Sequence, residues 1–292
     1  MRIGLFTDSL ESLSLDGVLT WLEQELPEVK DLEIGTGGYS PVPHCDPRAL
    51  LDDAGERARW LDALAARGFR LAALNVSGNP LEIPGHDRDL RRTIELAGLL
   101  GVDRIVCMSG GRAGLAGGGW FPGVEERVEH YWRTTVLPYW DEISHVASAQ
   151  TTLRLCFELE PGAAVYNVAT FERVAGSRLN LAVNLDPSHF FWQTIDPLAV
   201  VRRLGGRIAF AHGKDTALDE TRIPLDGVLD RRSWRFATVG EGHEVSWWRA
   251  FGETLRASGY DDVVSVEYED RTKAPVQGVL ESARAVSDAL AF

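Results

Sequence analysis

Four residues whose side chains are of types that bind divalent cations each stand at the end of a short apolar run. The runs are LRLCFE, LAVNLD, IAFAH and VVSVE, and their last residues are Glu158, Asp186, His212 and Glu267. Parallel strands buried on both faces have such continuous runs of Val, Ile, Leu and Ala. The carboxyl ends of the strands in a parallel barrel meet at one face, where active sites form. The sequence therefore predicts a site for a divalent cation, held by three carboxylates and one imidazole.

A cation held in this way would keep coordination positions for a substrate. Four protein ligands leave two positions of an octahedral shell open, and adjacent hydroxyl and carbonyl oxygens of a sugar fit such a pair. A cation bound to an α-hydroxyketone makes the neighbouring C–H more acidic and stabilises the enediolate that follows. Glu158 and Glu267 are expected to act both as ligands and as the acid/base pair, with Asp186 and His212 as anchoring ligands.

Other polar residues follow the same predicted strands. His189 comes three residues after Asp186, in DPSH, so its ring is predicted to lie near the substrate; the alternative is a histidine that packs beside the next helix. Three carboxylates leave the shell of a divalent cation with a negative charge. Lys214 and Arg235 are therefore expected to lie nearby as cationic partners, and we assign both to substrate binding.

Aromatic residues and one more histidine are candidates for the wall of the site. Trp120, Trp192 and Trp234 fall in loops after predicted strands four, six and seven. An indole face stacks well on the C–H face of a sugar, so these side chains are candidate substrate walls, with packing in the core as the alternative. His44, in PVPHCD after the second predicted strand, is a further candidate for substrate binding.

Strand-like and helix-like segments alternate along the whole chain. Segments with helical periodicity lie between the strands, for example DLRRTIELAGLLG, which is expected to stop at Gly101. Eight such alternations in one chain favour a closed (β/α)8 TIM barrel of the α/β class, formed by one domain over residues 1–292. The eight predicted strands are Ile3–Thr7, Asp31–Ile34, Arg70–Asn75, Arg104–Met108, Leu153–Glu158, Leu179–Asp186, Arg207–His212 and Val263–Glu267.

Two insertions interrupt this alternation. The glycine-rich segment 109–123 follows the fourth predicted strand, and we interpret it as either a lid over the site or a plain loop. It lacks the GK[ST] motif of a phosphate-binding loop. The segment from about 214 to 240 lies between the seventh predicted strand and the next helix.

The composition narrows the classes of partner. With 30 Lys and Arg against 43 Asp and Glu, the net charge is −13, whereas nucleic-acid binding needs a basic surface. The three cysteines lack the spacing of a zinc or redox pair, which favours a reducing, cytoplasmic setting. The chain starts directly in a predicted strand, and its apolar stretches fall short of the roughly 18 residues of a membrane span.

Several motifs resemble those of the sugar phosphate isomerase/epimerase family, in the xylose-isomerase-like barrel superfamily. They are IGTGGYSPVPHCDP, SGNPL, CFELEPGAAVYN, NLDPSHFFWQ, AHGKDT and SVEYED. The resemblance implies a divalent metal, most commonly Mn²⁺, at the four positions named above, with Mg²⁺, Co²⁺ and Zn²⁺ as alternatives. It also implies that the two glutamates exchange the proton, that His189 and Asn79 contact the substrate, and that the chain forms a homo-oligomer.

Two motifs depart from this pattern. Relatives often have histidine where this chain has Glu160 and in the NPLHP motif, which reads NPLEI here over residues 79–83. Both departures replace an imidazole near the site by a carboxylate or shift it away. The expected substrate contacts are affected, whereas the metal ligands are not.

The leading hypothesis is a divalent-metal-dependent epimerase or isomerase of a ketose or keto-sugar. The alternative is a 3-oxo-glycoside lyase, or deglycosidase, in which the same proton removal expels a β-substituent, with a small second subunit as a partner. A cyclitol dehydratase is a third variant of this chemistry. An endonuclease of the same fold would need more histidine ligands and a basic face, and a non-catalytic binding protein would be expected to lack one of the four ligands.

Overall fold

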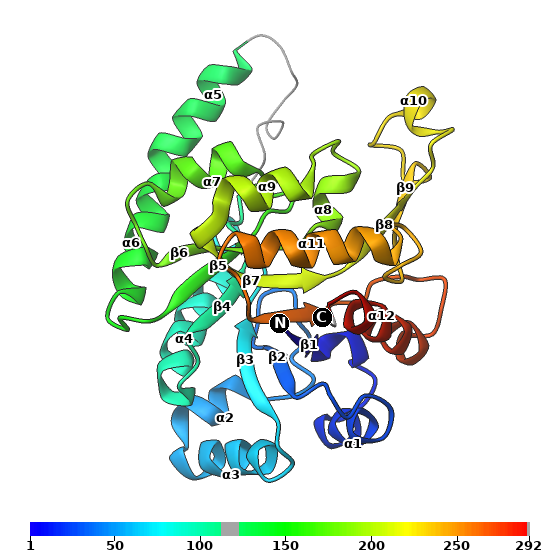
Figure 1. The fold of residues 1–292 in the computed structure, drawn as a ribbon. Coiled ribbons are helices and arrows are strands. Elements are labelled where there is room, and N and C mark those ends of the chain that lie inside the picture. The colour runs from blue at the N-terminus through cyan, green and yellow to red at the C-terminus, as the bar shows by residue number, and fades with distance from the viewer. Residues whose placement is uncertain (112–122, 291–292) are drawn as a thin grey trace.

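Eight parallel strands close into a barrel in the computed structural model, which describes residues 1–111 and 123–290 (Figure 1). The order around the barrel is β1-β10-β7-β6-β5-β4-β3-β2, and each neighbouring pair is parallel. The predicted TIM barrel is therefore confirmed. The barrel strands are β1 (Arg2–Phe6), β2 (Asp31–Gly35), β3 (Arg70–Asn75), β4 (Arg104–Cys107), β5 (Arg154–Glu158), β6 (Leu181–Leu185), β7 (Ile208–Gly213) and β10 (Val263–Val266).

Helices between the strands cover the outside of the barrel (Figure 1). The longer ones are α1 (Leu15–Glu25), α3 (Ala54–Ala65), α4 (Pro84–Leu100), α6 (Leu137–Ala147), α7 (Val168–Ala175), α9 (Pro197–Leu204), α11 (Val245–Ala257) and α12 (Pro275–Leu290). Helix α5 (Val124–Tyr131) has eight residues, like α7 and α9. Shorter helical segments are η1 (Thr7–Leu10), α2 (Pro47–Asp52), η2 (Trp132–Val136), α8 (Ser188–Phe191), η3 (Gly205–Arg207) and α10 (Ile223–Asp226).

Local sequence explains several of the helix ends. Gly101 ends α4 in the left-handed conformation, with φ of 70°, as its position after the periodic segment predicts. The Asp53 side chain accepts hydrogen bonds from the backbone N–H groups of Gly55 and Glu56 at the start of α3. Among the described helices, none combines the length and the apolar character needed to cross a membrane.

Apolar side chains form two groups, outside and inside the barrel. The larger group packs the helices onto the outer face of the strands. The smaller one consists of strand residues alone, among them Ala73, Val106, Cys156 and Phe210, and fills the barrel interior. Toward the carboxyl ends of the strands, the buried residues of the interior are polar, and their side chains form the site described below.

The segment 214–240 contains a feature that the sequence analysis did not predict. Strands β8 (Asp215–Leu218) and β9 (Trp234–Ala237) form a two-stranded antiparallel sheet, with Asp215 opposite Ala237. Together with α10, this sheet extends away from the barrel (Figure 1). Its strands have four residues each and carry charged side chains, so the apolar pattern that revealed the barrel strands is missing.

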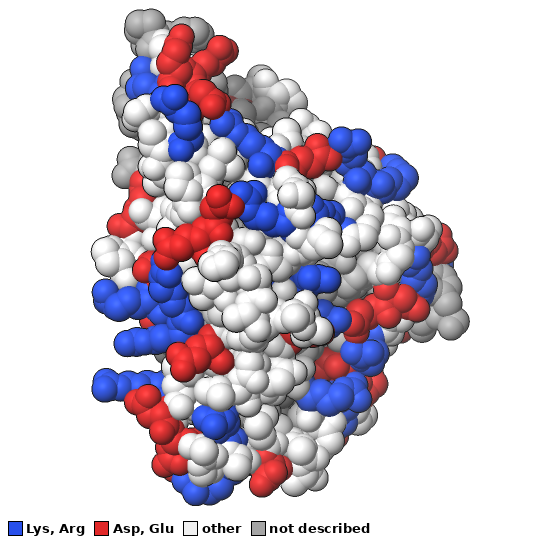
Figure 2. All heavy atoms as spheres, turned by 90° about the vertical axis from the view of Figure 1, so that its left-hand side faces the viewer, with Lys and Arg blue, Asp and Glu red and all other residues white. Residues whose placement is uncertain are grey.

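Charges of both signs are mixed on the outer face formed by the helices. Figure 2 shows Lys and Arg side chains lying among Asp and Glu side chains on one such face. Ion pairs connect neighbouring helices, as between Arg91 of α4 and Glu142 of α6, at 2.8 Å. On this face the charges alternate and do not gather into one basic field. That the protein has no nucleic-acid partner stays a prediction.

Candidate metal centre

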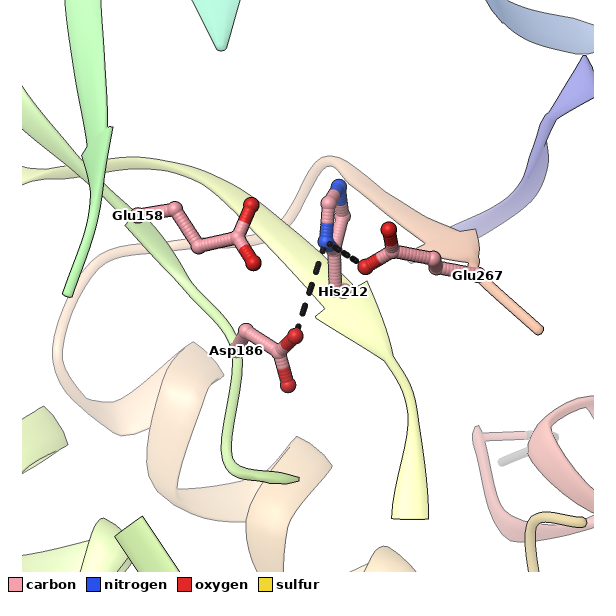
Figure 3. Close-up of side chains that lie close together, drawn as sticks. All are labelled: Glu158, Asp186, His212 and Glu267. Atoms are coloured by element: carbon pink, nitrogen blue, oxygen red, sulfur yellow. Dashed lines mark ion pairs between the residues drawn. The ribbon is translucent and has the colours of Figure 1, made fainter. Parts of the chain in front are cut away.

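The four predicted ligands converge at the carboxyl ends of their strands (Figure 3). One ligand atom from each of Glu158, Asp186, His212 and Glu267 can be chosen so that all four lie within 4.8 Å of one another. Glu158 is the last residue of β5, Asp186 directly follows β6, His212 lies in β7, and Glu267 directly follows β10. These four strands are neighbours in the barrel, in the order β5-β6-β7-β10. One half of the barrel therefore supplies the whole cluster.

The cluster fits a divalent cation. The side chains of Asp186 and His212 are fully buried, and that of Glu267 is 12% exposed. Among the described residues, Asp186 Oδ2 has no hydrogen-bond partner, although a buried carboxylate oxygen normally has one. His212 Nδ1 lies 3.0 Å from Glu267 Oε2 and 3.8 Å from Asp186 Oδ2. Carboxylate oxygens and one imidazole nitrogen are ligands suited to Mn²⁺, Mg²⁺, Co²⁺ or Zn²⁺.

A buried glutamate that the sequence analysis missed orients the histidine of the cluster. Glu33 of β2 is fully buried, and its Oε2 lies 3.0 Å from His212 Nε2. Asn75 and Ser265 also donate hydrogen bonds to the Glu33 carboxylate, at 2.7 Å each. Since a carboxylate accepts only, Nε2 donates to it, and Nδ1 is the nitrogen that faces Asp186 and Glu267 and could bind a cation once it has lost any proton. Within the run DLEIG, nothing but its position mid-strand marked this carboxylate as unusual.

The environments of the two glutamates of the cluster shift their pKa values in opposite directions. Burial, reinforced by the negative charge of Glu267, raises the pKa of Glu158. For Glu267 burial acts in the same direction, but the positive charges of Lys214 and His212 outweigh it and lower its pKa to about 2. Environments that drive two carboxyl pKa values apart are characteristic of an acid/base pair.

Both histidines near the cluster are strongly influenced by carboxylates. Burial disfavours a charged His189 ring, yet Asp186 and Glu158 outweigh this and raise its pKa to about 9. Its Nε2 lies 2.7 Å from Glu158 Oε1, so the structure brings His189 to the site. Burial also disfavours charge on His212, and the carboxylates of Glu33 and Glu267 raise its pKa well above the ordinary value.

The two predicted cationic partners occupy different places. The Lys214 ammonium is buried beside the cluster, 3.1 Å from Glu267 and 2.5 Å from Glu269. Arg235 lies on β9 and points elsewhere, to Asp270 at 3.2 Å. The structure therefore places Lys214 at the site, whereas Arg235 lies outside the wall of the cavity described next.

A cavity of about 610 Å³ opens beside the cluster, a volume within the range of small-molecule sites. Glu158, Glu267, His189 and Lys214 form part of its wall. The remaining described lining residues are Phe6, Asp8, Ser9, Glu11, Tyr39, Ser40, Pro41, Asn75, Ser77, Met108, Glu160, Trp192, Trp234, Phe236, Tyr268 and Glu269.

Aromatic side chains form one side of this cavity. Trp192, from the loop after β6, stacks on Trp234 of β9 with ring centroids 4.5 Å apart and an angle of 4° between the planes. Phe236 of β9 packs against Trp234 and against the ring of His189. The β8–β9 sheet therefore serves to hold this wall. Trp192 lies in the cavity wall, where a substrate-binding side chain is expected.

The other predicted substrate-binding residues lie apart from the cavity wall or outside the described residues. His44 is buried, with Nδ1 2.9 Å from Thr7 Oγ1 and Nε2 3.0 Å from the backbone oxygen of Leu13. The Asn79 side chain accepts a hydrogen bond from Gly111 N and donates one to Glu82. Both side chains thus hold loops together. Trp120 and most of the predicted lid fall within 112–122, outside the described residues.

Residues 32–290 match the family described as xylose isomerase-like TIM barrels, and the chain belongs to this family. The protein YfiH of Bacillus subtilis (strain 168) is 32% identical to this chain in an alignment 318 positions long, which covers 99% of each chain.

Solved structures show the same fold. One is the IolI protein, determined with a bound zinc atom, which is 19% identical and has a TM-score of 0.68, with 99% of this chain and 98% of that chain covered. Another is an L-ribulose 3-epimerase, which is 16% identical and has a TM-score of 0.63, with 99% and 94% covered. At these identities the likeness concerns the fold.

Proposed function

We propose that this protein is a divalent-metal-dependent epimerase or isomerase that moves a proton next to the carbonyl of a ketose or keto-sugar. The observation that carries the proposal is the placement of Glu158 and Glu267 on two sides of one buried cluster, both lining the same cavity. Two carboxylates that flank a bound carbon atom can remove a proton on one side and return it on the other.

The environments of the two glutamates support a division of roles. Glu267, with its pKa near 2, is ionised and ready to accept a proton. Glu158, with its pKa raised by burial, holds a proton more readily and can deliver it. His189 donates to or accepts from Glu158 Oε1, so this ring can pass the proton on or bind a substrate oxygen. Lys214 places a positive charge beside Glu267 and keeps it ionised.

Glu158, Asp186, His212 and Glu267 would hold the cation, with Mn²⁺ as the first candidate and Mg²⁺, Co²⁺ and Zn²⁺ as alternatives. When bound, such a cation supplies Lewis acidity, which polarises a carbonyl and lowers the energy of negative charge on its oxygen. The relation to L-ribulose 3-epimerase and to the zinc-bound IolI protein supports this assignment.

One observation favours a second candidate, the 3-oxo-glycoside lyase. The stacked pair of Trp192 and Trp234 extends the cavity wall with an apolar surface that suits an aglycone ring. In that reaction, proton removal by the same glutamate is followed by loss of the β-substituent. We propose a small second subunit as a partner only for this candidate.

Solvent deuterium distinguishes the two candidates. The Mn²⁺-loaded protein is incubated in D₂O with a panel of ketoses and 3-oxo-glycosides and followed by NMR. We expect deuterium to enter an intact sugar beside its carbonyl. Loss of the aglycone would instead establish the lyase.

Two variants control this experiment. The Glu267→Gln protein should lose exchange by roughly a hundredfold or more, since general acid–base catalysis contributes about 10²–10⁴. The Glu95→Gln protein, changed at an exposed position of α4, should retain full exchange. Absence of both deuterium uptake and aglycone loss with every cation and sugar tested would refute the proposal.

A further inference from the structure

Residues on two sides of the cavity carry buried polar atoms without hydrogen-bond partners. Among the described residues, these atoms include Asp8 Oδ1, Ser77 Oγ and Trp192 Nε1, and all three residues line the cavity. Buried polar atoms without a partner are costly, so each indicates a partner that a ligand or water supplies. Asp8 as a carboxylate only accepts, whereas the indole N–H of Trp192 only donates. Hydroxyl groups, which both donate and accept, match this mixture.

The local structure holds the Asp8 carboxylate in place. Asp8 follows β1, its side chain is 9% exposed, and its Oδ2 accepts a hydrogen bond from Ser40 Oγ. Gly35, at the end of β2, makes this contact possible, since a Cβ atom there would overlap both Asp8 Oδ2 and Ser40 Oγ. His44 Nδ1 lies 3.9 Å from Asp8 Oδ1 and hydrogen-bonds Thr7 instead. Asp8 Oδ1 therefore keeps its capacity to accept.

Ser77 belongs to the same side of the cavity. Its backbone oxygen accepts a hydrogen bond from Tyr39 N, in the loop that also carries Ser40. Its own N–H donates to Asn75 Oδ1, which fixes the segment after β3. Asp8 and Ser77 thus line the cavity from connected loops after β1, β2 and β3.

The aromatic wall lies across the barrel from this polar side. In the closed strand order, β1 and β2 are opposite β5 and β6, and Trp192 follows β6. A ring or chain between the two sides would stack its C–H groups on Trp192 and direct hydroxyls toward Asp8 and Ser77.

Charge in the cavity opposes an anionic ligand. Besides the cluster, the described wall carries four more carboxylates: Asp8, Glu11, Glu160 and Glu269. Two groups of the described wall can carry positive charge, and both are already engaged by carboxylates: Lys214 by Glu267 and Glu269, and the His189 ring by Glu158. Negative potential in a cleft repels a phosphate or carboxylate group and leaves a neutral molecule unaffected.

We infer that Asp8, Ser77 and Trp192 form a subsite for the hydroxyl groups of an uncharged polyol, and that the cavity rejects phosphorylated and carboxylated sugars. This inference rests on the proposed function, because it names the substrate class of the same cavity. Asp8 sets the specificity by accepting a hydroxyl hydrogen, and Trp192 supplies the stacking surface.

Equilibrium binding tests the subsite without turnover. Binding of sorbitol and of sorbitol 6-phosphate to the Mn²⁺-loaded protein is measured by calorimetry. We expect sorbitol to bind at least about tenfold more tightly than its phosphate. The Asp8→Ala variant should weaken sorbitol binding roughly tenfold to a hundredfold, as expected for a lost hydrogen bond to a charged group.

Control variants separate a lost contact from a lost fold. Asp8→Asn, which keeps an acceptor oxygen, should weaken sorbitol binding less than Asp8→Ala, and both variants should bind Mn²⁺ as the parent does. Asp288→Asn, at an exposed position of α12, should leave sorbitol binding unchanged. Equal or tighter binding of the phosphate, no binding of either probe, or unchanged binding in Asp8→Ala would overturn the inference.

Failure of the subsite in the binding experiment can be distinguished from failure of the proposed function in the deuterium experiment. With ketose phosphates added to the panel of the deuterium experiment, exchange confined to the phosphorylated sugars would overturn the subsite and leave the proposed function standing. Selective sorbitol binding without deuterium exchange in any sugar would leave the subsite standing and overturn the proposed function.

Discussion

The two halves of the barrel divide the work of the site. Strands β5, β6, β7 and β10 are adjacent, and each has a candidate cation ligand at or next to its carboxyl end, so these polar side chains converge on one point. Strands β1 to β4 contribute no member of this cluster, and their loops carry separate polar groups such as Asp8 and Ser77. The proposed chemistry therefore depends on one half of the barrel and the proposed selection of the ligand on the other, and Glu33 of β2 connects the two halves through His212.

The largest effect is expected from a change in the ligand half. Asp186→Asn removes a buried anion from the cluster, so Mn²⁺ affinity should fall by more than the roughly ten- to hundredfold that loss of an outer partner causes. Calorimetric titration with Mn²⁺ measures this, and Glu95→Gln serves as the control. Parent-like affinity in Asp186→Asn would show that the cation binds elsewhere.

Glu33→Gln tests the link between the halves. The amide retains the shape of Glu33 but loses the charge that orients His212, so Mn²⁺ affinity should fall roughly ten- to hundredfold. The absorption spectrum of the Co²⁺-loaded protein should shift as well, because the position of the imidazole changes. Glu28→Gln, at an exposed loop position, is the matched control. An unchanged spectrum and affinity would limit Glu33 to a role in folding.

Cation binding should release a proton. Burial acts against charge on His212, but Glu33 and Glu267 raise its pKa well above the ordinary value, which favours the protonated ring in the absence of a cation. Since a cation needs the neutral ring, binding should release up to about one proton, and affinity should fall by up to about tenfold for each unit by which the pH is lowered. Calorimetry in buffers of different ionisation enthalpy counts the protons, and a heat independent of the buffer would contradict this.

A change in the other half should leave the cation untouched. Gly35→Ala places a methyl group against Asp8 and Ser40, so it should lower stability by about 1–3 kcal/mol through overpacking. Sorbitol binding should weaken several-fold while Mn²⁺ affinity stays within about twofold. Chemical denaturation and the two titrations measure these effects together. If Gly35→Ala reduces Mn²⁺ affinity as strongly as Asp186→Asn, the division between the halves is wrong.

Much of the architecture and the whole ligand cluster followed from local patterns. A barrel strand buried on both faces is a continuous apolar run, and a charged residue at its end is easily recognised. The predicted strands agree with the observed ones to within one or two residues, as at β3, Arg70–Asn75. Among the described strands, β8 and β9 were missed, because each combines polar or charged residues with apolar ones and lacks a continuous apolar run.

Residues on loops were harder to place, because a loop side chain can turn in several directions. His44 turns inward to Thr7, Arg235 turns to Asp270, and Asn79 holds Gly111, although each has a side chain suited to sugar binding. Asp8 and Ser77 line the cavity although no motif marked them.

The sequence by itself determined the barrel and the four residues of the candidate metal cluster, because hydrophobic burial of parallel strands leaves a local signal and brings all strand ends to one face. Only the tertiary structure decided that Glu33 reaches His212 from β2 and that Trp234 stacks on Trp192. These contacts join strands and loops that are distant in the chain, and their geometry arises when the barrel closes. Local residue patterns do not specify this geometry.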